Sequence, residues 1–186
     1  MRITYCFEIP RDFIRDFPAR CLEILEQFHH SAKIRDREVT LLIMAATTAL
    51  IIPKERLSET HLSKDRSDFV ELGKDVSWGR PFLSYNLCAS PDLWLYGRVQ
   101  NPHSTPDDWE EFQPIRNQCG SEILSIFRNA LAHGNIYTEG RPISSLLFWS
   151  NQMDRNDKDV IGYKYIKIPV QEFYEFIKRW VAFLNQ

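Results

Sequence analysis

The chain has 186 residues, a length typical of one domain that can bury a core, and we expect a single domain over residues 1–186. Hydrophobic residues make up 44% and charged residues 26% of the sequence, which excludes an intrinsically disordered chain. The formal net charge of −2 excludes a large basic surface for duplex nucleic acid, so any RNA contact must depend on a local patch or groove.

Residues 10–30 carry apolar side chains at spacings of three and four, which predicts a helix that Pro18 either starts or kinks. Asp36 is a predicted N-cap of a second helix, in which residues 39–53 carry no charge. A helix that is apolar on every side is expected at the centre of the core. It is shorter than the roughly 20 residues that span a bilayer, so we expect no membrane segment. Pro53 is expected to end or bend it.

Residues 55–72 are charged with sparse apolar positions, and we expect one peripheral helix there, ended by Gly73. Residues 74–103 contain several glycines and prolines. We interpret this stretch as an irregular cover packed over the core; the alternative is a platform on which bases stack. Its aromatic residues include Trp78, Phe82, Tyr85, Trp94 and Tyr96.

Residues 104–108 have the hydroxyl, proline and acidic residues of a helix start. The next helix is predicted from Ile115 or later through His133. Residues 143–150 and 160–168 are rich in β-branched and aromatic residues and predict a β-hairpin. Pro169 then precedes an amphipathic helix. We therefore predict a mainly α protein, an antiparallel helical bundle with one β-hairpin in its C-terminal half.

The densest group of polar side chains on a predicted helix lies in residues 126–135. Arg128, Asn129 and His133 occupy its last two turns, and Gly134 is a predicted left-handed C-cap. At 100° per residue, Arg128 and His133 lie about 140° apart, so one helix cannot easily aim both at one atom. Asn129 and His133 are i and i+4 neighbours, so the amide can fix the imidazole tautomer. An arginine from a second copy of the helix could complete the site.

The spacing of arginine and histidine in this motif occurs twice more in the chain. Arg98 and His103 are separated by Asn101-Pro102, which disfavours a helix. Arg56 and His61 follow Pro53, with neither an asparagine after the arginine nor a glycine after the histidine. Only the copy at Arg128 is expected on a clear helix.

The motif has a structural interpretation beside the functional one: Arg128 as a surface ion-pair partner, Asn129 as a solvated residue and His133 as a complement to the helix dipole. However, residues 128–133 resemble the Arg-polar-x-x-x-His signature of the HEPN superfamily, the helical nucleotide-binding and ribonuclease domains. The motif covers six residues, and the order and length of the elements extend the resemblance to nearly the whole chain.

The resemblance implies a homodimer formed through the motif helix and a metal-independent endoribonuclease of the kind that acts in toxin or defence systems. His133 would be the general acid or base, Arg128 would stabilise the transition state, and Asn129 would orient His133 or touch phosphate. One alternative is a catalytically silent module that binds nucleotide or a protein partner, such as an antitoxin or a nucleotidyltransferase. Another is a helical interaction protein whose motif occurs by chance.

Neither a metal nor another cofactor is expected. The cysteines form no C-x-x-C pair, and we expect reduced thiols. His29 and His30 are adjacent on a predicted helix and point in different directions, so they do not indicate a metal site. Residues 1–5 lack a basic segment followed by a long apolar run, so we expect no signal peptide and a cytoplasmic location. The four cysteines are Cys6, Cys21, Cys88 and Cys119.

Overall fold

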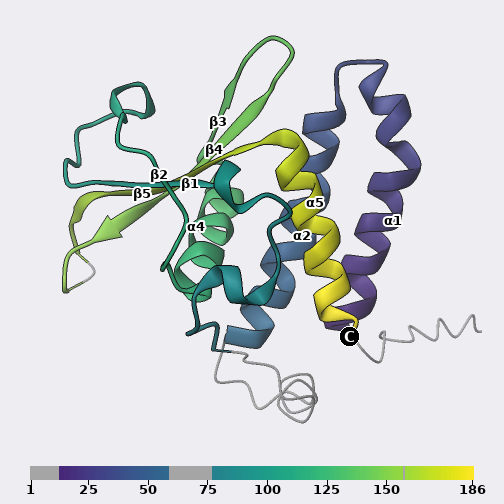
Figure 1. Cartoon of the computed structure of the whole chain (residues 1–186), viewed down its shortest axis with the longest axis horizontal. Helices are drawn as coiled ribbons and strands as arrows, with labels where there is room; N and C mark the ends of the chain where they lie inside the picture. Colours follow the sequence, from purple (N-terminus) through teal and green to yellow (C-terminus); the bar gives the residue numbers. More distant parts are fainter. Residues whose placement is uncertain (1–12, 59–76, 157) are drawn as a thin grey trace, which may run out of the picture.

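The structure is a computed structural model that describes residues 13–58, 77–156 and 158–186. An antiparallel sheet lies on one side and helices α1, α2 and α5 lie on the other, with α4 between them (Figure 1). The helices are α1 (Phe13–Lys33), α2 (Glu38–Ser58), α4 (Gly120–His133) and α5 (Val170–Leu184).

The five strands of the described sheet follow the order β2-β1-β5-β4-β3. The predicted hairpin is confirmed as β4 and β5, but it forms the middle of a sheet, so the prediction of a helical bundle with one hairpin is only partly correct. The missed strands are short. β1 depends on pairing with the distant strand β5, whereas β3 forms a local hairpin with β4 that the sequence analysis did not predict. The strands are β1 (Leu95–Val99), β2 (Gln113–Pro114), β3 (Ile136–Glu139), β4 (Ser145–Met153) and β5 (Val160–Pro169).

The loop between α1 and α2 corrects the role predicted for Asp36. This residue has φ 53°, and its N–H donates to the carbonyl of Lys33, while the N–H of Arg37 donates to the carbonyl of Ala32. These are the two hydrogen bonds of a Schellman motif, so Asp36 ends α1 instead of capping α2. Pro18 and Pro53 lie inside α1 and α2, and neither ends its helix.

The uncharged helix α2 is central, as predicted. It packs against α1, α4 and α5. The indole N–H of Trp180 on α5 donates to the carbonyl of Ala49, 2.8 Å away in the core. None of the helices in the described ranges has both the length and the apolar character needed to cross a membrane.

The aromatic stretch is a packed cover, as predicted, because four of its large rings are buried. They belong to Trp78, Phe82, Tyr85 and Trp94. Tyr96 differs, since it lies half-buried in β1. Of the peripheral helix predicted over 55–72, residues 55–58 belong to the end of α2, and the rest lies outside the described residues.

The sheet face opposite α4 is covered by the segment between β1 and β2. Trp109 from this segment stacks on Tyr165 of β5, with ring centroids 4.6 Å apart. The helix start predicted at 104–108 is a single 3-10 turn, η3 (Pro106–Asp108). The following helix, α4, begins only at Gly120, because Pro114 belongs to β2 and the N–H of Gly120 bonds to the carbonyl of Arg80.

Candidate active site on helix α4

Helix α4 buries most of its surface but leaves one strip accessible. The buried residues face the sheet and α2, and Arg128 and His133 lie at the two margins of the accessible strip. At 100° per residue this strip is about 140° wide, the angle between the two side chains. It therefore contains all three residues predicted for the site. The strip consists of Ser121, Glu122, Ser125, Arg128, Asn129, Ala132 and His133.

Gly134 ends α4 as predicted, in the left-handed conformation with φ 72°, and its N–H donates to the carbonyl of Ala130. β3 begins two residues later. This abrupt turn leaves His133 exposed at the last position of the helix. A histidine buried against the hairpin would have excluded a role in catalysis, and the structure does not bury it.

Arg128 is held by two neighbours. Its Nε–H donates to Oε1 of Glu55 on α2 at 2.6 Å, and its Nη1 donates to Oδ1 of Asn129 at 2.9 Å. The two side chains of the ion pair are 38% and 34% exposed, so water still reaches them. The contacts fix the plane of the guanidinium and leave Nη2 for another acceptor.

The contact with Arg128 changes the role expected for Asn129. A guanidinium can only donate, so the amide must turn its oxygen toward Arg128 and its NH₂ group away from it. Asn129 therefore orients Arg128 in this structure, where the sequence predicted a contact with His133. The NH₂ group has no hydrogen-bond partner among the described residues, and it remains available to a ligand.

Sequence reasoning missed Glu55, which is 73 residues away from Arg128. The ion pair agrees with the structural interpretation of Arg128, and exposed pairs of this kind stabilise by roughly 0–1 kcal/mol. The accessible strip agrees with the functional interpretation. One signal pointed to Glu55: it is the first carboxylate after the uncharged run of α2, from which only Lys54 separates it.

A polar pocket of about 410 Å³ lies between α4 and the strands β4 and β5, and Asn129 lines it. We name it the α4–β4 pocket. Inside it, Lys164 and Glu122 form an ion pair with Nζ and Oε1 2.6 Å apart. Its lining consists of Ser121, Glu122, Ser125, Ile126, Asn129, Ser150, Asn151, Gln152, Met153 and Lys164.

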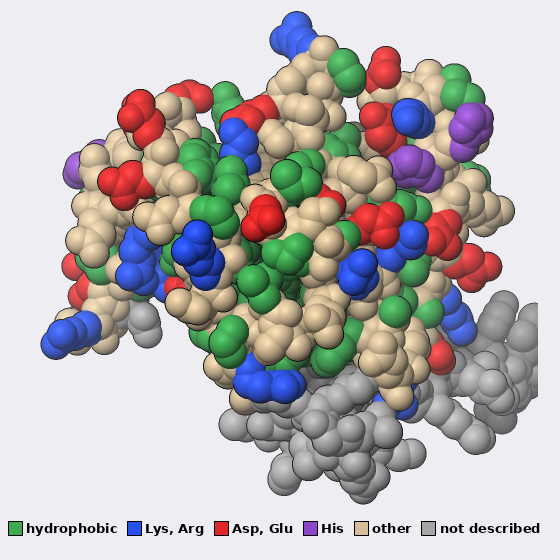
Figure 2. Space-filling model, viewed as in Figure 1, with side chains coloured by type: hydrophobic (Ala, Val, Ile, Leu, Met, Phe, Trp, Pro, Cys, Tyr) green, Lys and Arg blue, Asp and Glu red, His purple; other side chains and the backbone are tan. Residues whose placement is uncertain are grey.

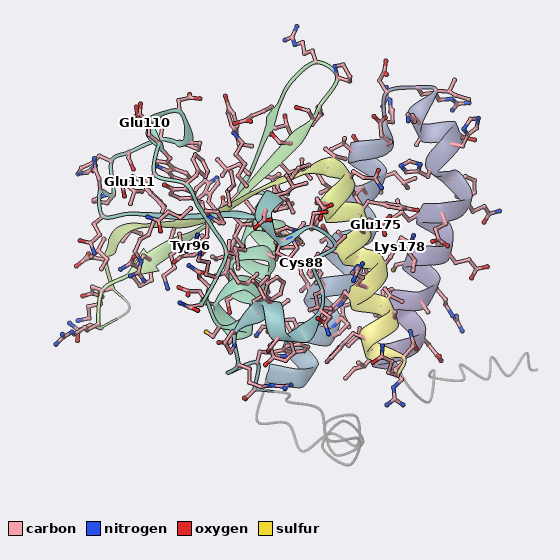
Figure 3. The ribbon with its side chains drawn as sticks, viewed as in Figure 1. Cys88, Tyr96, Glu110, Glu111, Glu175 and Lys178 are labelled. Atoms are coloured by element: carbon pink, nitrogen blue, oxygen red, sulfur yellow. The ribbon has the colours of Figure 1, made fainter. Side chains whose placement is uncertain are left out.

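Tyr96 of β1 supports this ion pair from the sheet (Figure 3). Its hydroxyl donates to Oε1 of Glu122 at 3.2 Å. Burial, with a smaller contribution from the charge of Glu122, raises the pKa of Tyr96 to about 12. Tyr96 is therefore protonated at neutral pH and acts as a hydrogen-bond donor to the Glu122 carboxylate.

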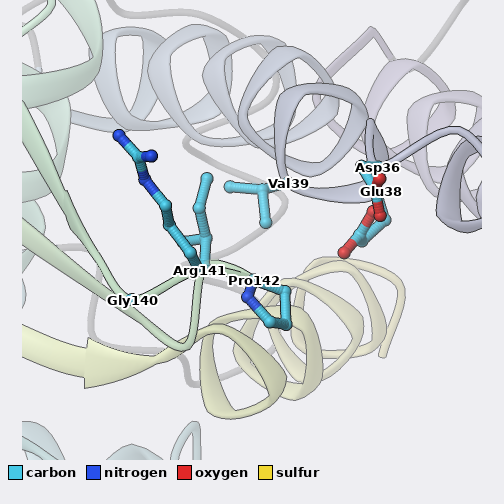
Figure 4. A pocket seen from close by; sticks show the side chains of 7 residues that line it. Asp36, Glu38, Val39, Gly140, Arg141 and Pro142 are labelled. Carbon is cyan, nitrogen blue, oxygen red and sulfur yellow. The ribbon is translucent and has the colours of Figure 1, made fainter.

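Another cavity lies between the start of α2 and the turn from β3 to β4 (Figure 4). Asp36 and Glu38 line one side of it, and Arg141 on the turn points away from them. It contains no residue of the motif. In the view of Figure 2, basic and acidic side chains are interspersed over the coloured surface without a continuous basic area. On this face an anionic ligand would therefore need a local groove.

The cysteines are not part of the motif on α4. Cys21, Cys88 and Cys119 are free thiols, and Cys6 lies outside the described residues. Burial, followed by the charge of Glu172, raises the pKa of Cys88 to about 12, so this thiol is unreactive. Within the described ranges, no cluster of three histidine, cysteine or carboxylate side chains could hold a metal ion.

The two other arginine–histidine spacings differ from the motif. Arg98 lies on β1 and His103 in the loop after it, both exposed, as the proline between them predicted. Arg56 lies in the last turn of α2, which extends past Pro53, so the expectation that only Arg128 lies on a helix was wrong. His61 lies outside the described residues.

Comparison with known proteins agrees with the motif on α4. The profile of the family described as HEPN pEK499 p136 matches residues 5–186. Comparisons with curated proteins and with solved structures gave no match. The matched range includes every helix and strand described above, together with Arg128, Asn129 and His133. The chain therefore belongs to the HEPN family.

Proposed function

We propose that this HEPN protein is a metal-independent endoribonuclease that acts on cytoplasmic RNA in a toxin or defence system. The observation that carries the proposal is the accessible strip of α4, which places Arg128 and His133 at its margins and Asn129 between them. Both side chains face the accessible side of one helix, where they can contact RNA.

In the proposed reaction, His133 takes the proton of the ribose 2′-hydroxyl, whose oxygen attacks phosphorus. The bond from phosphorus to the 5′-oxygen breaks, and an imidazolium returns a proton to that oxygen. Imidazole suits both steps because its unperturbed pKa is near neutral. The products are a 2′,3′-cyclic phosphate and a 5′-hydroxyl. Arg128 binds the phosphoryl oxygens as negative charge develops on them.

A second copy of α4 would complete the site. Between Arg128 and His133 on the strip lies the small side chain of Ala132, which allows another helix to approach closely. A twofold axis through such a contact brings Arg128 of one copy toward His133 of the other. Arg128 and His133 are about 140° apart, which keeps them from meeting on one helix. Across the twofold axis, however, the two Arg128–His133 pairs line one cleft.

The ion pair between Arg128 and Glu55 favours a second candidate, a catalytically silent module. Because Glu55 offsets the charge of Arg128, the strip could bind a nucleotide or a protein partner without performing chemistry. The partner would be an antitoxin or a nucleotidyltransferase. Cleavage assays separate the two candidates.

The first experiment incubates RNA with the protein in excess EDTA. We expect fragments that end in 2′,3′-cyclic phosphate, because the proposed chemistry uses no metal. His133→Ala should abolish cleavage without unfolding the protein, since an exposed residue at a helix end loses little packing. If the wild-type protein and His133→Ala are equally inert on single-stranded and structured RNAs, the silent module is the correct function.

Arg128→Lys tests the phosphate contact in the same assay. Lysine keeps the charge but replaces a planar fork by a single donor, so we expect a loss of cleavage of about 100-fold or more. Arg98→Lys is the matched control, because Arg98 has the same spacing from a histidine but lies on a strand. Equal effects of the two substitutions would contradict a specific role for Arg128.

A further inference from the structure

The α4–β4 pocket contains polar groups that the protein leaves without partners. Ser150 is 4% exposed, and its hydroxyl, which is not fully enclosed, forms no hydrogen bond within the described part of the chain. The Oε1 atom of Gln152 is buried and also lacks a partner. Buried polar groups in proteins are normally hydrogen-bonded. Both residues line the pocket, so together they indicate a ligand that offers a donor and an acceptor.

The charges of the pocket indicate that this ligand is neutral. Its two charged residues, Glu122 and Lys164, compensate one another at 2.6 Å, and the other lining residues are uncharged. The second carboxylate oxygen of Glu122 has no partner among the described residues, so it is another acceptor. A phosphate would gain little here, whereas an uncharged ring with hydrogen-bonding groups on its edge fits.

Asn129 connects this pocket to the proposed position of the phosphate. Its oxygen accepts from Arg128, and its amide nitrogen is turned away from that contact. Because Asn129 also lines the pocket, a ligand held there lies one side chain away from Arg128. In an RNA strand, the group at that distance from a phosphate is the base of the adjacent nucleotide.

We propose that the α4–β4 pocket binds a nucleobase with an exocyclic amino group, next to the phosphate that is cleaved; this rests on the proposed ribonuclease function. Gln152 Oε1 and the second oxygen of Glu122 accept from the amino group. The Ser150 hydroxyl and the Asn129 NH₂ donate to acceptors on the base. Amides and carboxylates recognise base edges in this way, and unpaired bases expose those edges. Uracil has no exocyclic amino group, so the pocket disfavours it.

The volume agrees with this occupant. The pocket is an open depression of about 410 Å³, within the range of roughly 300–1,000 Å³ for small-molecule sites. It is lined from α4, β4 and β5, elements that the core holds in place, so its hydrogen-bonding groups are preorganised.

The test uses a mixture of single-stranded RNAs with every base at each position, and sequencing of the cleavage products. We expect wild-type protein to prefer A, C or G over U on one side of the cleaved bond. Ser150→Ala and Gln152→Leu should each reduce that preference at least fivefold, because a pair of hydrogen bonds to a base edge discriminates by roughly 5- to 150-fold. Ser84→Ala and Gln171→Leu, which alter exposed residues elsewhere, should keep the wild-type preference.

A binding measurement makes the two proposals distinguishable. The His133→Ala protein, which cannot cleave, is titrated with fluorescent pentamers of A, C and U, with and without Gln152→Leu. Tighter binding of A or C that is lost in Gln152→Leu supports the pocket, even if wild-type protein cleaves nothing and the ribonuclease proposal fails. Equal binding of all three pentamers, or cleavage without any base preference, overturns the pocket and leaves the ribonuclease proposal standing. If Ser150→Ala and Gln152→Leu change only the oligomeric state, the proposal of a base-binding pocket is also overturned.

Discussion

At the scale of single residues, the main feature is the chain of contacts from Glu55 through Arg128 to Asn129. A carboxylate and an amide oxygen each accept one guanidinium N–H, so the arginine is oriented before a ligand arrives. Preorganisation of this kind lowers the cost of aligning charge with the transition state. Glu55 touches no reacting atom in the proposed mechanism, so it is a positioning residue.

Glu55→Ala should therefore lower kcat more than it raises KM, by up to about 100-fold, because small misplacements of a positioned group reduce the rate by that order. Glu55→Gln keeps an acceptor oxygen and should restore part of the loss. Steady-state kinetics on one RNA, together with thermal melting, measures both effects. Glu175→Gln is the control, since Glu175 pairs with Lys178 on the surface of α5. A purely structural ion pair would alter the melting temperature alone.

At the scale of elements, two glycines meet different requirements. Gly134 permits the left-handed turn from α4 to β3, and no atom lies within 4 Å of the Cβ that another residue would add. Gly97 on β1 lies under the ring of Tyr165 and beside the backbone carbonyl of Glu111, which a Cβ would overlap. The first glycine serves conformation and the second serves close packing.

Gly134→Ala should accordingly lower the free energy of unfolding by about 1–2 kcal/mol, the cost of a left-handed alanine. Gly97→Ala should lower it by roughly 3 kcal/mol or more, since the aromatic stack of Tyr165 and Trp109 must move. Urea unfolding measures both values. A Gly97→Ala protein as stable as the wild type would show that the stack is not held against β1.

At the scale of the whole molecule, the layers explain how a central helix can carry a site. The sheet covers one side of α4 and α2 covers another, yet the strip bounded by Arg128 and His133 stays accessible. The side facing the sheet opens into the α4–β4 pocket, and the side facing α2 ends at Glu55. A second copy that meets this strip would complete the site without changing the fold.

Mixing two inactive variants tests that assembly. Arg128→Ala and His133→Ala proteins, each inert alone, should regain cleavage when mixed and allowed to exchange subunits. About half of the dimers are then mixed, and each mixed dimer keeps one Arg128 and one His133. The cleavage rate and the mass by analytical ultracentrifugation are measured on the same samples. Dimers that exchange but stay inert would contradict a site shared between the two copies.

The sequence by itself determined the elements whose signals are local. Helices α1, α2 and α5, the hairpin of β4 and β5, and the end of α4 at Gly134 follow from periodicity, residue type and one glycine. The family also followed from local sequence, since the six residues of the motif carried the resemblance that the profile over residues 5–186 bears out. The period of a helix or strand is written into neighbouring residues, so these features needed no tertiary information.

Tertiary structure decided the features that depend on distant partners. β1 is a strand because the distant strand β5 offers it hydrogen bonds. The guanidinium of Arg128 lies between Asn129 and Glu55, and the packing of α2 against α4 places Glu55 there. The pocket had only a faint sequence signal. Leu146 and Phe148 place apolar side chains on one face of β4, and Ser150 and Gln152 place polar side chains further along the same face. A site is a set of side chains that meet in space, and the sequence records their spacing only along the chain.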